Sequence, residues 1–76
     1  MDLTMYTTDE VAKCLGTTRQ TVEMLRQVGV LKAIKIGKRY MYPSDVLADF
    51  QRTYLGCDLS NRAKALAAKA IVENAN

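Results

Sequence analysis

The stretch TTDEVAKCLGTTRQTVEMLRQ, residues 7–27, decides the fold because it holds two helix patterns on either side of a glycine turn. Thr7 and Glu10 have the capping-box spacing, in which each side chain bonds the other residue's backbone amide at the start of a helix. Gly16 is expected to end this first helix in a left-handed conformation. Four apolar residues follow helical spacing and are expected to be buried: Val11, Ala12, Cys14 and Leu15.

A second helix pattern follows after a short turn. Thr18 is its preferred N-cap, although Thr17 and Gln20 also have the capping-box spacing. Gly29 is expected to end it. One face carries Val22, Leu25 and Val28, and the opposite face carries Arg19, Gln20, Glu23 and Arg26. Because the connection is so short, the two helices must pack against each other, which predicts a helix-turn-helix unit.

Residues 33–42 change to the alternating pattern of β-strands, with a turn at Gly37 and Lys38. Four residues are predicted on the inner face of this two-strand hairpin: Ile34, Ile36, Tyr40 and Tyr42. The tyrosines could instead be stacking platforms for single-stranded nucleic acid, but their alternation with the isoleucines favours packing in the core. Three basic residues are expected to project outward or to lie at the tip: Lys35, Lys38 and Arg39.

Two more helices are predicted after the hairpin. Ser44 is the expected cap of a third helix that ends at Gly56, and Asp58 or Ser60 is expected to cap a fourth. The fourth helix has a narrow apolar face of Ala63, Leu66, Ala67, Ala70 and Ile71. An isolated helix of ~15 residues is marginal in water, so it must dock on its own domain, on a second copy or on a partner protein. The sequence does not choose among these three.

The patterns together predict a mainly α fold with a small β-hairpin. Residues 1–56 are expected to form a winged helix-turn-helix of three helices and a two-strand wing. Residues 57–76 are expected to form an amphipathic helix for docking or oligomerisation. With 49% apolar and 25% charged residues, the 76-residue composition is typical of a small globular protein.

The residue inventory argues against several functions. The chain has no histidine and two cysteines without paired spacing, so it lacks both the ligands of a zinc finger and a Ser-His or Cys-His nucleophile. We therefore expect no enzyme activity, no cofactor and no metal. No apolar run reaches the ~18 residues that a membrane span needs. No secretory signal pattern opens the chain, and the cytoplasm is the expected location.

Basic charge is concentrated on the second helix and the hairpin. The formal net charge of the chain is +3, whereas residues 16–42 alone carry +5 and the segments on either side, 1–15 and 43–58, each carry −2. Clustering of this kind is typical of a surface that binds a polyanion, although a solvated basic face has the same composition.

Over Tyr6–Phe50 the chain resembles the excisionase-type, MerR-like winged helix-turn-helix domains. The matching residues read YTTDEVAKCLGTTRQTV and GVLKAIKIGKRYMYPSDVLADF. The resemblance extends to phage and transposon excisionases, small phage regulators and the N-terminal domains of some small terminase subunits. It implies that the second helix enters the major groove of duplex DNA and that the wing lies against the neighbouring minor groove or backbone.

By position, the resemblance implies groove contacts from the second helix and backbone contacts from the wing. The residues concerned are Thr18, Arg19, Gln20 and Glu23 on the helix and Lys35, Lys38 and Arg39 on the wing. Arginine pairs well with guanine and glutamine with adenine, so Arg19 and Gln20 are expected to read bases. Thr18 and Thr21 are expected to anchor phosphates.

Two residues depart from the family pattern. Arg26 stands where the family often has an apolar residue, and it either adds a phosphate contact or alters helix packing. Glu23 repels phosphate but can accept a hydrogen bond from cytosine, so it is either a specificity device or a sign that this face binds something else.

Two other functions are possible for a winged helix-turn-helix besides sequence-specific binding of duplex DNA: a protein-interaction module and a DNA-packaging factor. Besides duplex DNA, an integrase or another protein could bind through the C-terminal helix. Several copies or a dimer are expected to bind DNA together.

Overall fold

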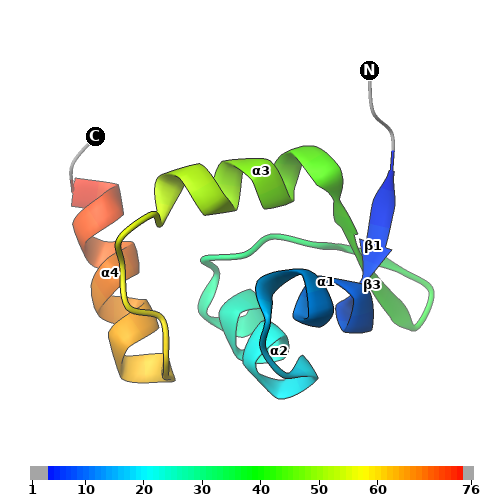
Figure 1. Cartoon of the computed structure of the whole chain (residues 1–76), viewed down its shortest axis with the longest axis horizontal. Helices are drawn as coiled ribbons and strands as arrows, with labels where there is room; N and C mark the ends of the chain where they lie inside the picture. The colour runs from blue at the N-terminus through cyan, green and yellow to red at the C-terminus, as the bar shows by residue number, and fades with distance from the viewer. Residues whose placement is uncertain (1–3, 75–76) are drawn as a thin grey trace.

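Four helices and a three-stranded antiparallel sheet make up the fold, which the computed structural model describes over residues 4–74 (Figure 1). The helices are α1 (Thr8–Leu15), α2 (Arg19–Val28), α3 (Ser44–Thr53) and α4 (Arg62–Asn74). The strands are β1 (Met5–Thr7), β2 (Ile34–Ile36) and β3 (Arg39–Pro43). The predicted winged helix-turn-helix with an additional C-terminal helix is confirmed.

The first helix begins and ends as the sequence predicts. Thr7 Oγ1 accepts a hydrogen bond from the amide of Glu10 at 3.2 Å, and Glu10 Oε1 accepts one from the amide of Thr7 at 2.9 Å. Gly16 follows the helix at φ 68°, a left-handed conformation that glycine adopts without steric cost. Local hydrogen bonding therefore defines both ends of α1.

The buried face of α1 is narrower than predicted. Val11 and Ala12 are buried and Leu15 is half-buried, but Cys14 is exposed, so the prediction that it belongs to the core is wrong. At 100° per residue, Cys14 lies about 100° away from the centre of the face that the other three share. An eight-residue helix packed on one side cannot cover that position.

The second helix also follows its predicted caps. Thr18 Oγ1 accepts a hydrogen bond from the amide of Thr21 at 3.2 Å, so Thr18 rather than Thr17 is the N-cap. Gly29 ends the helix at φ 97°. The inward-facing residues Val22, Leu25 and Val28 are all buried.

The wing is part of a three-stranded sheet rather than a two-stranded hairpin. The strand order is β1-β3-β2, so β3 is central, and Tyr6 of β1 pairs with Tyr42 of β3. Strand β1, which the sequence does not predict, is only three residues long and ends at Thr7, the N-cap of α1. Because β1 continues into the helix-turn-helix, it joins the wing to that unit.

The predicted inner face of the hairpin is wrong for its two isoleucines. Ile34 and Ile36 are 49% and 55% exposed, whereas Tyr42 is fully buried and Tyr40 half-buried. The two-residue turn pairs Ile36 with Arg39, so every even-numbered residue faces an odd-numbered one. Residues that pair across two strands point to the same face of the sheet. The two isoleucines therefore point to one face, and Tyr40 and Tyr42 point to the other.

The loop after α2 contributes to the core. The carbonyl of Leu25 accepts the amides of Gly29, Val30 and Leu31 at 3.1–3.2 Å, which turns the chain inward. Val30 and Leu31 are buried as a result. The core also contains Val11, Ala12, Val22, Leu25, Val28, Tyr42, Leu47, Phe50 and Ala65.

The third helix starts without a side-chain cap. Pro43 is its N-cap and Ser44 is its first residue, so the predicted Ser44 cap is wrong. The Ser44 amide is already bonded to the carbonyl of Thr4 at 3.0 Å, because β3 continues directly into the helix. The helix ends at Thr53, and Gly56 lies beyond it in a turn at φ 86°.

The C-terminal helix packs against α2 of its own chain, through a face that the sequence did not predict. Ala65 and Ala68 are buried, while Leu66 and Ile71 are 49% and 68% exposed. The remaining residues of the predicted apolar face are exposed as well: Ala63, Ala67 and Ala70. Helix α4 therefore buries small side chains, while its larger apolar residues remain exposed.

Three polar contacts fix α4. Asn61 Oδ1 accepts a hydrogen bond from the amide of Lys64 at 2.9 Å, so Asn61 takes the capping role predicted for Asp58 or Ser60. Arg62 donates to the side chain of Gln27 on α2 at 2.8 Å. Lys69 Nζ donates to the carbonyl of Val28 at 3.1 Å.

Candidate nucleic-acid interface

A polar groove of about 520 Å³ lies between α2 and the wing, which comprises β2, β3 and the turn between them. Five of the nine predicted site residues line it: Arg19, Glu23 and Arg26 from α2, and Lys38 and Arg39 from the wing. The groove also takes in Asp9 from the start of α1. It therefore combines four cationic side chains with two carboxylates.

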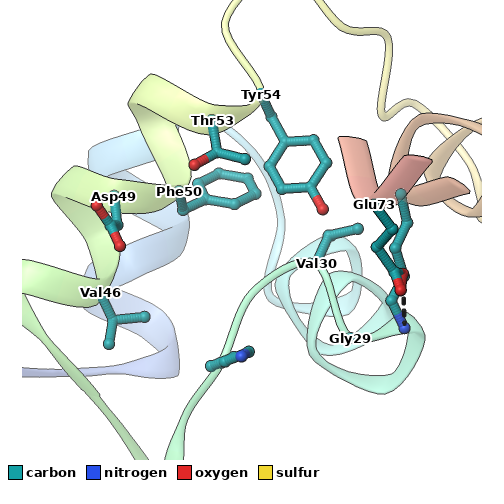
Figure 2. A pocket seen from close by; sticks show the side chains of 10 residues that line it. Gly29, Val30, Val46, Asp49, Phe50, Thr53, Tyr54 and Glu73 are labelled. Atoms are coloured by element: carbon teal, nitrogen blue, oxygen red, sulfur yellow. Dashed lines mark ion pairs between the residues drawn. The ribbon is translucent and has the colours of Figure 1, made fainter. Parts of the chain in front are cut away.

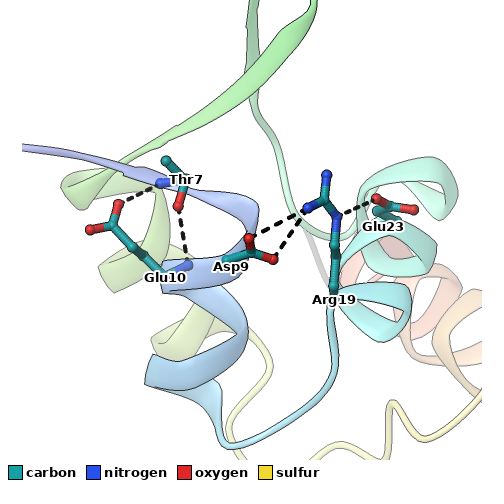
Figure 3. Close-up of polar contacts among 5 residues, drawn as sticks. All are labelled: Thr7, Asp9, Glu10, Arg19 and Glu23. Atoms are coloured by element: carbon teal, nitrogen blue, oxygen red, sulfur yellow. Dashed lines mark hydrogen bonds and ion pairs between the residues drawn. The ribbon is translucent and has the colours of Figure 1, made fainter.

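Arg19 lies at the first position of α2 between the two carboxylates (Figure 3). Its Nη1 is 3.4 Å from both carboxylate oxygens of Asp9, and its Nε is 3.2 Å from Glu23 Oε1. The hydrogen bond that Arg19 donates to Glu23 and the negative charge of Asp9 raise the pKa of Arg19 above its usual value. Arg19 is thus fully cationic, and two of its three guanidinium nitrogens already donate to protein acceptors.

Arg26 connects the helix to the wing. Its guanidinium carbon lies 3.8 Å from the centre of the Tyr40 ring, which is the geometry of a cation–π contact. Its Nε is buried, and no acceptor within residues 4–74 bonds to it. Lys35 approaches the same ring at 5.8 Å. The Arg26 side chain therefore packs against the wing, which joins α2 to β3.

Three of the four remaining predicted residues lie at the start of α2, and the fourth, Lys35, lies on β2. Thr18 and Thr21 share a hydrogen bond between their hydroxyl oxygens at 3.0 Å, and Gln20 is exposed beside them. These three and Lys35 do not line the groove. Lys38 and Arg39 are exposed at the tip of the wing.

Sequence reasoning missed Asp9 and Tyr40 as parts of this surface. From the sequence alone, Asp9 is a favourable negative charge at the positive end of α1. Its position two residues after the Thr7 cap does not reveal that the turn brings it to Arg19. Tyr40 was assigned to the core. A cation at position 26, where an apolar residue is common, was the available signal for a contact across to the wing.

A second hollow lies between α3, the end of α2 and α4, and contains none of the nine predicted residues (Figure 2). Val30, Val46, Phe50 and Tyr54 form its apolar part. Burial and the nearby carboxylate of Glu73 raise the pKa of Tyr54. This hollow lines the junction of α4 with the domain and has no concentration of positive charge.

The described part of the chain has neither a candidate metal site nor a candidate membrane-spanning helix. Residues 4–74 contain no group of three or more histidine, cysteine or carboxylate residues arranged to hold a metal ion. Within the same residues, no helix has the length and apolar character to cross a lipid bilayer.

Comparison with known families identifies the domain. A family model described as a helix-turn-helix domain matches residues 5–54, which is more than half of the chain. No curated protein and no solved structure matches the chain. The matched segment contains α1, α2, the sheet and α3, and thus every element that forms the groove. The chain belongs to the helix-turn-helix domain family and is a DNA-binding domain of the excisionase type.

Proposed function

We propose that the protein reads a specific duplex DNA sequence with α2 in the major groove and the wing on the neighbouring minor groove or backbone. The observation that carries this proposal is the groove between α2 and the wing, where four cationic side chains gather: Arg19, Arg26, Lys38 and Arg39. A phosphate backbone passing between a major and a minor groove would lie along this line of charges.

The proposed contacts divide into two kinds. Arg19 and Gln20 contact base edges from the first turn of α2, while Thr18 and Thr21 anchor phosphates there. Lys35, Lys38 and Arg39 hold the backbone from the wing, and Glu23 shapes the choice of base. The protein acts by binding, without catalysis.

Arg26 has a positioning role in this proposal. Its stacking on Tyr40 at 3.8 Å supports a fixed angle between the reading helix and the wing. A fixed angle means that little ordering is needed when both elements engage DNA together, which favours affinity. Arg26 is then expected to present its remaining nitrogens to a phosphate.

We further propose an excisionase-like role in recombination or a role as a small regulator in a phage or mobile element. A single domain offers few phosphate contacts, so several copies or a dimer are expected to bind together. The side of α4 that carries Leu66 and Ile71 supports contact with an integrase or another protein, since both residues are exposed. Selection of binding sites from randomised duplexes tests this role: direct repeats favour the excisionase, and an inverted repeat favours a dimeric regulator.

The test of DNA binding is the affinity for a random-sequence duplex, measured by fluorescence anisotropy across a series of salt concentrations. We expect the logarithm of the affinity to fall linearly with the logarithm of salt concentration. Arg39→Ala should weaken binding to every sequence and reduce the slope by about one. Arg52→Ala is the matched control, because Arg52 is an exposed arginine on α3 that is paired with Asp49 outside the groove.

The second candidate function is a module that binds proteins through the winged fold, as in DNA-packaging assemblies. The two carboxylates in the groove favour it, since Asp9 and Glu23 oppose phosphate. No binding to any duplex at low salt, or binding with no salt dependence, would reject the DNA proposal in favour of this one.

A further inference from the structure

Arg19 is the residue of α2 that we most expect to contact a base. In the free protein, however, it forms ion pairs with two carboxylates. Asp9 belongs to α1 and Glu23 to the next turn of α2, so the guanidinium of Arg19 forms ion pairs on two sides (Figure 3). All three side chains are open to solvent, and a DNA phosphate could reach them.

The chemistry of these carboxylates resembles that of the ligand. A carboxylate and a phosphate present paired oxygens to a guanidinium in the same way, so Asp9 occupies donors that a DNA phosphate would otherwise take. In Figure 3 one nitrogen of the Arg19 guanidinium points away from both acceptors. That nitrogen remains available for an acceptor on a base edge.

The two carboxylates also reduce the positive charge of the groove. Binding to random DNA depends almost entirely on phosphate contacts, whereas specific binding adds contacts to bases. A carboxylate that blocks a phosphate contact but leaves a base contact possible therefore weakens random binding more than specific binding.

We propose that Asp9, which lies outside α2, is a specificity-determining residue: together with Glu23 it keeps Arg19 from DNA phosphates and leaves one guanidinium nitrogen free for a base edge. This inference rests on the proposed DNA-binding function and concerns the discrimination between sequences. Glu23 then acts on Arg19 within the protein, and a hydrogen bond from cytosine is not required to explain its presence.

The experiment compares Asp9→Asn with Asp49→Asn. Both changes remove one exposed aspartate that is paired with an arginine, but Asp49 pairs with Arg52 on α3, away from the groove. Each variant is tested by fluorescence anisotropy on two duplexes of equal length, one of random sequence and one obtained by selection with the natural chain. Circular dichroism checks that both variants remain folded.

We expect Asp9→Asn to tighten binding to the random duplex by about twofold to fivefold, the range that the loss of an exposed ion pair produces. Binding to the selected duplex should change less, so the ratio of the two affinities falls. Asp49→Asn should leave the ratio unchanged. In an Arg19→Met background, Asp9→Asn should no longer lower the ratio, because the residue it acts through is gone.

Equal ratios for Asp9→Asn and Asp49→Asn would overturn the inference while leaving DNA binding intact. A fall in the ratio that persists in the Arg19→Met background would overturn it as well, because Asp9 would then act on DNA directly. Absence of binding to either duplex at low salt would instead reject the proposed function on which the inference rests.

Discussion

Helices α2 and α4 lie side by side but contribute to the fold in different ways. In α2 the large residues Val22 and Leu25 are buried, and Thr18 and Gly29 close the two ends. In α4 the buried residues are alanines, and Leu66 and Ile71 face outward. Helical spacing of large apolar residues therefore predicts burial only where a neighbouring element covers the face that carries them.

Replacing one leucine on each helix should give the largest difference in the free energy of unfolding between α2 and α4. Leu25→Ala should lower the free energy of unfolding by about 2–5 kcal/mol, because it leaves a cavity in the core. Leu66→Ala should change it by less than about 0.5 kcal/mol, since the side chain is half exposed. Denaturant titration followed by circular dichroism measures both. A large loss for Leu66→Ala would mean that a second copy covers this face in solution.

Enlarging an alanine tests the close contact of α4 with α2. Ala65 is fully buried, so Ala65→Leu should lower the free energy of unfolding by about 1–3 kcal/mol through overpacking. Ala67→Leu is the control, because position 67 is exposed on the same helix. The same denaturant titration applies. If both variants are as stable as the natural chain, α4 does not dock through the face that carries Ala65.

Removing the N-caps compares the helices at their ends. Thr18→Ala should lower the free energy of unfolding by about 1 kcal/mol, because α2 unfolds together with the core. Asn61→Ala removes the equivalent bond of α4, but a terminal helix can fray locally. We therefore expect a smaller global loss and faster amide hydrogen exchange confined to α4. Uniformly faster exchange across the chain would show that the two helices unfold as one unit.

The smallest expected effect on stability comes from Asp58, in the segment before α4. Hydrogen bonds from the Ser60 hydroxyl and the Lys64 ammonium lower the pKa of Asp58 from 3.8 to about 2. Because this pKa is depressed in the folded state, its contribution to stability is present above about pH 4 and is lost as the pH falls towards 2. The natural chain should exceed Asp58→Asn slightly in stability at neutral pH, and the difference should shrink as the pH falls through about 2 and vanish below it. A constant difference across that range would contradict the prediction.

The parts of the fold that the sequence predicted depend on local chemistry. Thr7, Glu10, Gly16 and Thr18 define helix ends through bonds that span three or four residues, so their roles can be read without knowing the tertiary structure. The hairpin turn at Gly37 is local in the same sense. The orientation of the isoleucines followed from that turn, and pairing residues across it would have placed them correctly.

The parts that the sequence did not predict depend on distances between segments. The pairing of β1 with β3, the stacking of Arg26 on Tyr40 and the contact of Asp9 with Arg19 all join residues ten or more positions apart. Residue type indicates what each side chain can do, but not which partner it meets. The docking face of α4 was missed for the same reason.

The bond from Lys69 to the carbonyl of Val28 has a consequence for the order of folding. It spans 41 residues, and a side chain added at Gly29 would come within 2.9 Å of Lys69 Nζ. The carbonyl of Val28, at the end of α2, thus gains this side-chain donor only when α4 is docked. We expect this contact to form after the rate-limiting step, because a terminal helix can dock on a domain that has already folded. Lys69→Met should therefore speed unfolding while leaving the refolding rate unchanged, which stopped-flow chevron measurements can detect.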